Sequence, residues 1–275
     1  MKKTEQELRA LGDSIRLDVL EMTYRAGANG GHIGGALSCA DILAVLYGEV
    51  MDISAGDPTN PLRDRFLLSK GHVALAHYAV LAEIGFISRD ELWKFEQPEG
   101  ELPTHEVMDV QRGIEISSGS LGYGLSVGVG CALNAKKRRL PYQTYVLLGD
   151  GECNEGTVWE ACMAAVKFEL DNLKIIVDVN RQSLDGFTES TMPIRDFKGV
   201  FAGFGCHVAE VDGHEPAQIA AALASAYPNK PTVLLAHTIK GKGIPSIEGK
   251  TGWHHARLTE EQYLSFKQEL EAANA

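Results

Sequence analysis

Apolar positions follow two different periods along this 275-residue chain. Over residues 4–25 they recur at three- and four-residue steps, which predicts an amphipathic helix. Elsewhere, short β-branched apolar runs without polar alternation predict strands buried on both faces of a parallel sheet. The predicted strands are 65–68, 143–148, 173–179 and 231–238, and predicted helices lie at 73–84, 121–137 and 157–168. We therefore predict an α/β fold with a doubly wound, mostly parallel sheet flanked by helices.

Turn and loop residues separate these elements. The glycine-rich segment 27–35 predicts a turn, and a second helix is expected to begin at Ser38, with its hydroxyl as the N-cap. Residues 97–120 form a long loop with little periodicity, which is typical of functional or partner-contacting segments. The last helix is expected to open with a capping box from Thr259 to Gln262. Because the sequence shows no repeat or linker, we expect a single domain over residues 1–275.

Composition limits the partners and the compartment. The formal net charge of −11 disfavours binding to nucleic acid or to an anionic membrane by bulk charge. No apolar run approaches the roughly 20 residues of a membrane span, and the polar N-terminus has no signal-peptide core. The five cysteines are scattered without a C-x-x-C pair, which favours free thiols in a reducing cytoplasm. We expect a cytoplasmic protein that binds neither nucleic acid nor membrane.

An acidic turn and an asparagine follow two neighbouring predicted strands. Asp150, in a Gly-Asp-Gly turn, comes directly after strand 143–148, and Asn180, thirty residues further on, follows strand 173–179. The carboxyl ends of such strands meet at the edge where α/β sheets bind ligands. A carboxylate and an amide oxygen there make a hard-oxygen cation site, and Mg²⁺ usually binds together with phosphates. The flanking glycines let backbone N–H groups approach those phosphates, so the pattern predicts a diphosphate cofactor.

Several histidines lie in predicted turns rather than on helix faces. Imidazoles at loop positions suit a site that handles sugar phosphates, because they donate to phosphate and move protons near neutral pH. These histidines are His32 in GGHIGG, His72 in SKGH, His105 in LPTHE and His254 in TGWHH. Those that lack this context and are treated as structural are His77, His207, His214 and His237.

Two other patterns point to different chemistry. Residues 124–128 (GLSVG) match the nucleophile elbow of serine hydrolases, but an elbow needs a strand directly before the serine, and here a Gly/Ser-rich loop enters a helix. No Walker A lysine and no full G-x-G-x-x-G follow a strand, which disfavours the common nucleotide sites. The turn 240–243 (KGKG) is either a phosphate contact or a solvated lysine turn.

Six ordered segments resemble the transketolase family. They are GGHIGGALSCADIL, DRFLLSKGH, GSLGYGLSVGVG, GDGECNEGTVWEA, DVNRQSLDG and TIKGKGI…GWHHARL, and they cover roughly residues 10 to 258. A GDG turn followed about thirty residues later by a strand-end asparagine is also similar to the thiamine diphosphate (ThDP) fingerprint. The resemblance implies the ThDP-binding fold and, within transketolases, the N-terminal, diphosphate-binding domain.

The resemblance implies a metal site and a diphosphate site. Asp150, the Asn180 side chain and the backbone carbonyl of Gln182 would bind Mg²⁺, or Ca²⁺ or Mn²⁺ in its place. The backbone of Gly149 and Gly151 would meet the diphosphate.

Further residues of the cofactor and substrate site follow from the same resemblance. His72 and His254 would lie near the diphosphate and the reactive carbon, and His32 and His105 would contact hydroxyls of the donor sugar. Because His255 follows where the family commonly has glycine, the resemblance does not decide which of these two imidazoles occupies the site. The other implied positions are Gly119, Ser120 and Leu121 at the aminopyrimidine, Leu184 on the thiazolium, Glu155 at a subunit interface and Lys240 at the rim.

The sequence departs from the family at three places. The usual G-H-P around the third histidine reads Thr104-His105-Glu106, and the usual strand end D-D-N reads Asp178-Val179-Asn180. The chain ends at Ala275, whereas transketolases are more than twice as long and use a second domain to bind the aminopyrimidine. That domain supplies a glutamate that activates the cofactor, so we expect a separate C-terminal subunit to complete each site, in an α2β2 assembly by analogy.

The resulting hypothesis is the N-terminal subunit of a split, ThDP- and Mg²⁺-dependent transketolase. It would transfer a two-carbon ketol unit from a ketose or ketose phosphate to an aldose or aldose phosphate. One alternative keeps the cofactor and changes the reaction, as in a deoxyxylulose-phosphate synthase or a 2-oxo acid dehydrogenase subunit. Another is a non-catalytic subunit that keeps the fold.

Overall fold

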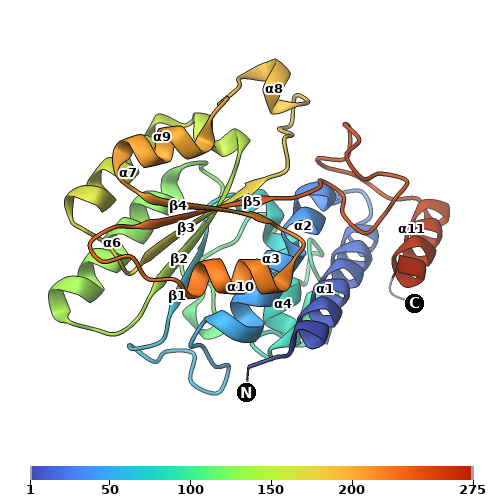
Figure 1. The fold of residues 1–275 in the computed structure, drawn as a ribbon. Helices are drawn as coiled ribbons and strands as arrows, with labels where there is room; N and C mark the ends of the chain where they lie inside the picture. The colour runs from blue at the N-terminus through green and yellow to red at the C-terminus, as the bar shows by residue number, and fades with distance from the viewer. Residues whose placement is uncertain (1, 274–275) are drawn as a thin grey trace.

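Five parallel strands form the centre of the computed structural model, which describes residues 2–273 (Figure 1). Their order across the sheet is β1-β2-β3-β5-β4, and every neighbouring pair is parallel. This confirms the predicted doubly wound α/β fold. The strands are β1 (Arg65–Leu68), β2 (Thr144–Gly149), β3 (Leu173–Val179), β4 (His207–Asp212) and β5 (Thr232–His237).

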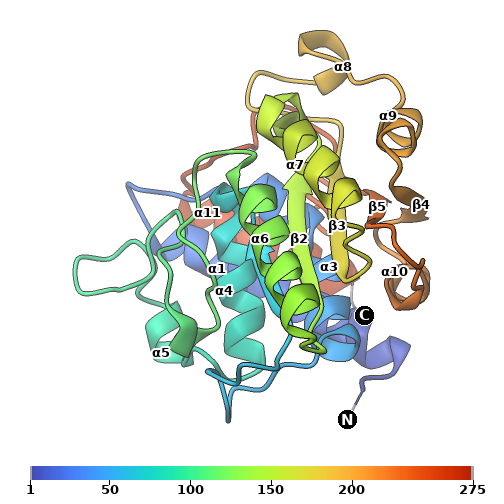
Figure 2. The same ribbon diagram turned by 90° about the vertical axis from the view of Figure 1, so that its left-hand side faces the viewer.

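Helices cover both faces of the sheet, as Figures 1 and 2 show. One face packs against α1 (Glu5–Arg25), α2 (Ile33–Ser38), α3 (Ala40–Val45), α4 (Ala74–Glu83) and α10 (Pro216–Ala224). The other packs against α6 (Tyr123–Arg138), α7 (Gly156–Lys167) and α9 (Phe197–Phe204). The remaining helices are α5 (Arg89–Leu92), α8 (Thr188–Thr191) and α11 (Glu260–Ala273), of which α11 lies against α1.

Strand residues alternate between the two cores. In β2, Leu147 joins the core under α1 to α4, whereas Val146 and Leu148 join the core under α6 and α7. Side chains of a strand point to opposite faces in turn, so a strand covered on both faces is almost entirely apolar. This explains why β1, β2, β3 and β5 read as nearly continuous apolar runs, whereas the edge strand β4 (HVAEVD) is only partly buried and carries polar residues.

The chain reverses its direction across the sheet after β4. It passes from β3 to the edge strand β4 through α9 on one face and returns to β5 through α10 on the other. Strand β3 thus leads to α9 on one face, whereas its neighbour β5 leads through residues 238–259 to α11, which lies against α1 on the other face. Connections that leave adjacent strands towards opposite faces open a crevice at the carboxyl ends of those strands. The residues that follow β2, β3 and β5 meet at this crevice.

The helix predicted to begin at Ser38 begins earlier. Helix α2 starts at Ile33, the helix is interrupted at Cys39, and the Ser38 hydroxyl donates to the Asp178 carboxylate at 2.6 Å instead of capping a helix. The sequence pattern did not predict helix at Gly34 and Gly35 because glycine has a low intrinsic helix propensity.

The capping box expected at the start of the last helix is confirmed. The capping box of α11 forms, with the Gln262 N–H donating to Thr259 Oγ1 at 3.2 Å and the Thr259 N–H donating to Gln262 Oε1 at 3.0 Å. All five cysteines carry free thiols. Between residues 2 and 273, none of the helices has the length and apolar character needed to cross a membrane.

Candidate active site

The four predicted loop histidines come together. The ring centroid of His32 lies 5.4 Å from that of His72, 5.8 Å from that of His105 and 5.3 Å from that of His254. His255 joins them with its ring 4.8 Å from His32. The sequence left open whether His254 or His255 occupies the site, and the structure places both in this histidine cluster. His254 is the one that also lies 4.9 Å from His72.

Close packing of glycines holds the histidine-bearing loops together. A Cβ on Gly71, in the SKGH turn, would lie 2.3 Å from the Ser118 hydroxyl, and one on Gly34 would lie 2.4 Å from the Trp253 carbonyl. An antiparallel bridge between Gly31 and Ala256 joins the first and last of these segments. Both glycines therefore serve the approach of one loop to another, a role that requires the absence of a side chain.

Burial keeps the histidines at the centre of the cluster uncharged at neutral pH. Burial, followed by the nearby Lys70, lowers the pKa of His72 to about 2. Burial and the neighbouring His254 lower the pKa of His32 to about 3, and burial with Lys240 lowers that of His254 to about 4. A neutral imidazole both donates and accepts a hydrogen bond, which suits hydroxyl recognition and proton transfer.

Two buried polar atoms at the cluster point to a ligand. His32 Nδ1 and the Ser118 hydroxyl are buried without a hydrogen-bond partner among residues 2–273. A buried polar atom left unpaired costs about 1–3 kcal/mol, so native proteins rarely keep one without a reason. A bound molecule with hydroxyl or phosphate groups would satisfy both.

The predicted metal ligands lie in two adjacent turns, one after β2 and one after β3. The Asp150 carboxylate accepts from the Gly151 N–H at 2.8 Å and from the Arg181 N–H at 2.6 Å. Asn180 Oδ1 accepts from the Gln182 N–H at 3.1 Å. This turn needs a left-handed backbone at Arg181, with φ of 63°, which is uncommon outside glycine and is often found at functional sites. Oxygen atoms from the ends of β2 and β3 thus lie together.

A buried ion pair determines which way the Asn180 amide faces. Asp178 and Lys70 pair while both are almost fully buried, and Asp178 Oδ2 also accepts from Asn180 Nδ2 at 3.0 Å. Burial favours a protonated Asp178, but Lys70 and donors from Ser38 and Thr238 outweigh it and hold the pKa of this carboxyl below its ordinary value. A carboxylate can only accept, so it binds the amide nitrogen and leaves Asn180 Oδ1 for other partners. The sequence analysis missed this role of Asp178 and Lys70.

Lys240 connects the turn after β3, which contains Gln182, to the histidine cluster. Its ammonium group lies 3.3 Å from the carbonyls of Gln182 and Ser183 and 3.0 Å from His254 Nδ1. Burial and the positive charge of Lys70 lower the pKa of Lys240 to about 8. The Gln182 carbonyl oxygen therefore already faces a positively charged group, the Lys240 ammonium.

Glu152, a buried residue that the sequence analysis did not select, ties together the loops after β1 and β2 and the loop before α6. Its carboxylate accepts from the Ser69 hydroxyl, from the Gly122 N–H at 2.7 Å and from the Gly149 N–H at 2.9 Å. It lies two residues after Asp150, in the acidic turn, which is the signal that could have identified it.

The other predicted positions lie around this centre. Gly119 has a left-handed backbone, with φ of 129°, and packs against the His105 ring. Glu155 is exposed at the start of α7. Leu184 is 71% exposed after β3, ready for an apolar contact. Ser120 and Leu121 are exposed beside Gly119.

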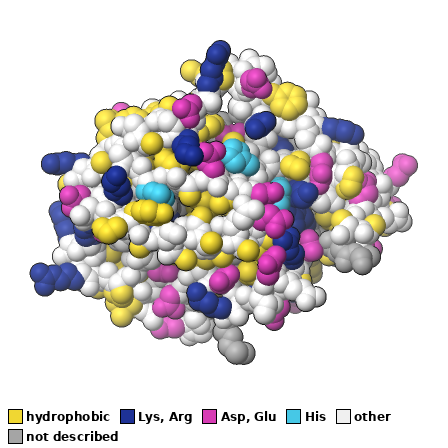
Figure 3. All heavy atoms as spheres, viewed as in Figure 1, with side chains coloured by type: hydrophobic (Ala, Val, Ile, Leu, Met, Phe, Trp, Pro, Cys, Tyr) yellow, Lys and Arg dark blue, Asp and Glu magenta, His cyan; other side chains and the backbone are white. Residues whose placement is uncertain are grey.

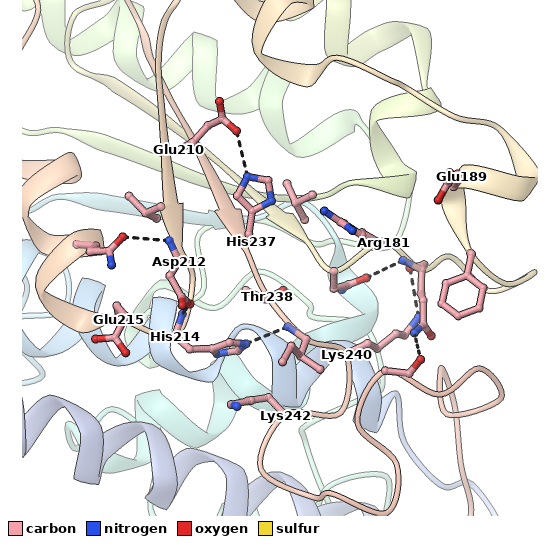
Figure 4. Close-up of a pocket in the computed structure, with 18 residues that line it drawn as sticks. Arg181, Glu189, Glu210, Asp212, His214, Glu215, His237, Thr238, Lys240 and Lys242 are labelled. Atoms are coloured by element: carbon pink, nitrogen blue, oxygen red, sulfur yellow. Dashed lines mark hydrogen bonds and ion pairs between the residues drawn. The ribbon is translucent and has the colours of Figure 1, made fainter.

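The remaining histidines lie outside the cluster. His214 Nδ1 bonds Asp41 at 2.8 Å, and its Nε2 accepts from the Ile239 N–H at 2.9 Å. His237 contacts Glu210 at 3.1 Å. Both line a depression of about 930 Å³ that borders the Asn180–Gln182 turn (Figure 4). Histidines, acids and bases are mixed on this face near β4 and β5 (Figure 3).

The arrangement suits an oxygen-ligated cation better than a metal bound by side-chain clusters. Within residues 2–273, no group of three or more His, Cys, Asp or Glu side chains is placed to hold a metal ion. The turns after β2 and β3 instead offer three oxygen atoms: the carboxylate of Asp150, the amide oxygen of Asn180 and the backbone carbonyl of Gln182. Mg²⁺ and Ca²⁺ prefer such ligands.

Comparison with known sequences gives a consistent result. The family profile described as "Transketolase, thiamine diphosphate binding domain" matches residues 9–274. An apulose-4-phosphate transketolase subunit from Phocaeicola vulgatus is 43% identical over 263 residues, covering 94% of this chain and 92% of that protein. A 6-deoxy-6-sulfo-D-fructose transketolase subunit from a Clostridium species is 39% identical and is matched over its full length.

Solved structures agree with the sequence comparisons. Transketolase from Campylobacter jejuni superposes with a TM-score of 0.87 and 31% identity, and the match covers 98% of this chain but 43% of that one. Transketolase from Leishmania mexicana gives a TM-score of 0.87, with coverage of 98% and 42%. The chain therefore belongs to the transketolase family and matches its N-terminal, thiamine diphosphate-binding subunit.

Proposed function

We propose that this chain is the N-terminal subunit of a two-chain transketolase that transfers a two-carbon ketol unit from a ketose or ketose phosphate to an aldose or aldose phosphate. One observation carries the proposal: three oxygen ligands meet five imidazoles at the carboxyl edge of the sheet. The family match favours transketolase over the other ThDP enzymes.

The metal ligands in this proposal are the Asp150 carboxylate, Asn180 Oδ1 and the Gln182 carbonyl. They fit Mg²⁺, or Ca²⁺ or Mn²⁺, because all three are hard oxygens. Two backbone N–H bonds fix the Asp150 carboxylate, and the Asp178 carboxylate fixes the Asn180 amide. The metal would neutralise diphosphate oxygens, with Gly149 and Gly151 letting the backbone approach them.

The loop residues would orient the cofactor and the sugar. His72, His254 and Lys240 would face the diphosphate and the reactive carbon, while His32 and His105 would bond to donor-sugar hydroxyls. Gly119, Ser120 and Leu121 would contact the aminopyrimidine, and Leu184 would pack on the thiazolium. When bound, ThDP supplies the carbanion chemistry, and the protein supplies orientation and a water-excluding pocket.

A second subunit would complete each site. Same-length relatives are named as transketolase subunits, and the matched solved transketolases are more than twice as long as the matched part. Side chains that suit such an interface are exposed in the loops around the site: Val107, Met108, Tyr123, Leu184 and Phe187. We propose that a C-terminal transketolase chain supplies the aminopyrimidine-binding domain and its glutamate, in an α2β2 assembly with Glu155 at a subunit interface.

The same proposal covers domain organisation and location. Residues 1–275 would form one ThDP-binding domain, since all five strands belong to one sheet. Five free thiols support a reducing, cytoplasmic location.

Ketol transfer by the two-chain enzyme tests the proposal. A ketose phosphate donor and an aldose phosphate acceptor should react only with ThDP and a divalent cation present. Asp150→Ala should lower kcat/KM by at least ~100-fold, because it removes the charged metal ligand. Unchanged activity in Asp150→Ala would support a non-catalytic chain, and decarboxylation of pyruvate would favour a different ThDP reaction.

A further inference from the structure

A buried chain of polar side chains lies directly behind the His105 loop. His77 Nδ1 bonds the Glu106 carboxylate, and His77 Nε2 lies 2.6 Å from the Tyr47 hydroxyl. Glu106 is 2% exposed, and His77 is 1% exposed. Nothing in the proposed metal or cofactor site uses this network.

The three side chains satisfy one another. The Nδ1–H of His77 donates to the Glu106 carboxylate, and His77 Nε2 shares a second hydrogen bond with the Tyr47 hydroxyl. A buried carboxylate is tolerated only where it is well hydrogen-bonded or paired. The Glu106 side chain is therefore confined to this position, between α4, which carries His77, and the segment that carries Tyr47.

Fixing Glu106 also fixes the direction of His105. Along this segment His105 is exposed, Glu106 is buried and Val107 is exposed, so successive side chains point to opposite sides. With Glu106 directed into the core, His105 must point away from it, where its ring lies 5.8 Å from that of His32.

Backbone bonds extend this anchor to the neighbouring loop. The Glu106 carbonyl accepts from the Ser118 N–H at 2.9 Å, and the Met108 N–H donates to Ser117 Oγ at 3.0 Å. The His105 ring packs against Gly119, the next residue of that loop. The position of Glu106 therefore determines where both loops enter the site.

We propose that Glu106, held by His77 and Tyr47, is a positioning residue that places His105 for donor-sugar binding. Glu106 stands where transketolases usually have proline after the third histidine. A proline restrains the backbone through its ring, whereas here a buried side-chain network does so. The donor-binding part of this inference rests on the proposed function.

Hydrogen exchange of the isolated full chain tests the anchor without any reaction. In Glu106→Ala, amides of residues 105–108 and 117–119 should exchange about tenfold faster than in the wild type. The side-chain network is absent in this variant, so the loops can open without the cost of breaking it. Glu106→Gln should exchange like the wild type, since its amide oxygen still accepts from His77 Nδ1. Leu223→Ala, in the buried face of α10, controls for general destabilisation. Equal exchange in Glu106→Ala and wild type would overturn the proposal.

Steady-state kinetics of the two-chain enzyme test the positioning role. Glu106→Ala and His77→Leu should raise KM for the donor ketose by about 10- to 100-fold. Glu106→Gln should have a donor KM close to that of the wild type. The ThDP affinity of all three variants should stay within about twofold of the wild-type value. Faster exchange with an unchanged donor KM would overturn the positioning role. Absence of ketol transfer in the wild type would instead reject the proposed function, and the exchange result would still decide the anchor.

Discussion

At the level of single residues, the sequence predicts the proposed ligands better than the groups that orient them. Asp150 and Asn180 could be proposed from their joint spacing at the ends of neighbouring strands, and the loop histidines from their place in predicted turns. Asp178, two residues before Asn180, is part of an apolar strand, and its link to Lys70 spans 108 positions. Only the folded sheet brings these two charges together, so the orientation of the Asn180 amide could not be predicted.

A single substitution tests this orientation. Asn180→Asp should weaken Mg²⁺-dependent ThDP binding by about 10- to 100-fold, because it places a carboxylate against Asp178 and removes the amide donor. Titration calorimetry on the two-chain enzyme measures this affinity. An affinity of Asn180→Asp equal to that of the wild type would contradict the assigned orientation.

At the level of elements, the positions of β1, β2, β3 and β5 were predicted closely, whereas the edge strand β4 and the start of the second helix were not. Nearly continuous apolar runs allow little choice, because a strand covered on both faces is almost entirely apolar. The partly buried β4 lacks such a run. Helix α2 contains Gly34 and Gly35, which local preference assigns to a turn. Tertiary packing decides instead, since the missing side chain at Gly34 lets α2 approach the backbone of Trp253.

Adding one methyl group tests this close approach. Gly34→Ala should lower the free energy of unfolding by about 1–3 kcal/mol and displace the loop that carries His254, because the new Cβ would meet the Trp253 carbonyl. Gly130→Ala is the matched control, since Gly130 lies inside α6 with open space around it, and should stabilise by about 0.5–1 kcal/mol. Urea denaturation gives both values. Equal effects of the two substitutions would show that α2 does not need its glycine.

At the level of the whole molecule, the site draws on loops from both ends of the chain. The antiparallel bridge between Gly31 and Ala256 closes the histidine cluster across 225 positions, a contact that depends on topology and not on local pattern. The family resemblance could therefore point to the residues. The contacts that bring them together, and the buried unpaired atoms His32 Nδ1 and Ser118 Oγ, could be found only from the folded structure.

The buried, neutral histidines of the cluster make the stability of the chain pH-dependent. His72 has an ordinary pKa of 6.5 when unfolded and a pKa of about 2 when folded, so below pH 6.5 the unfolded state binds more protons. The contribution of His72 to stability is therefore fully present above pH 6.5 and is lost as pH drops, by up to about 1.4 kcal/mol per pH unit. His32 and His254 contribute in the same direction, but less, because solvent screens them more.

Denaturation of the cofactor-free chain between pH 7.5 and 5 measures this dependence. His72→Gln should flatten the slope of unfolding free energy against pH relative to wild type, whatever its effect on absolute stability. His207→Gln, at a histidine outside the cluster, is the control and should leave most of the slope in place. Parallel slopes for His72→Gln and wild type would contradict the buried, neutral state of His72.

The central claim is that this chain provides the diphosphate-binding half of a shared transketolase site. The most direct measurement is the rate of ketol transfer with ThDP and Mg²⁺, for this chain alone and for the same chain titrated with its C-terminal partner subunit. The account predicts no turnover by the chain alone and a rate that rises with partner concentration until the two subunits are equimolar. Full ketol transfer by this chain without a partner would contradict it.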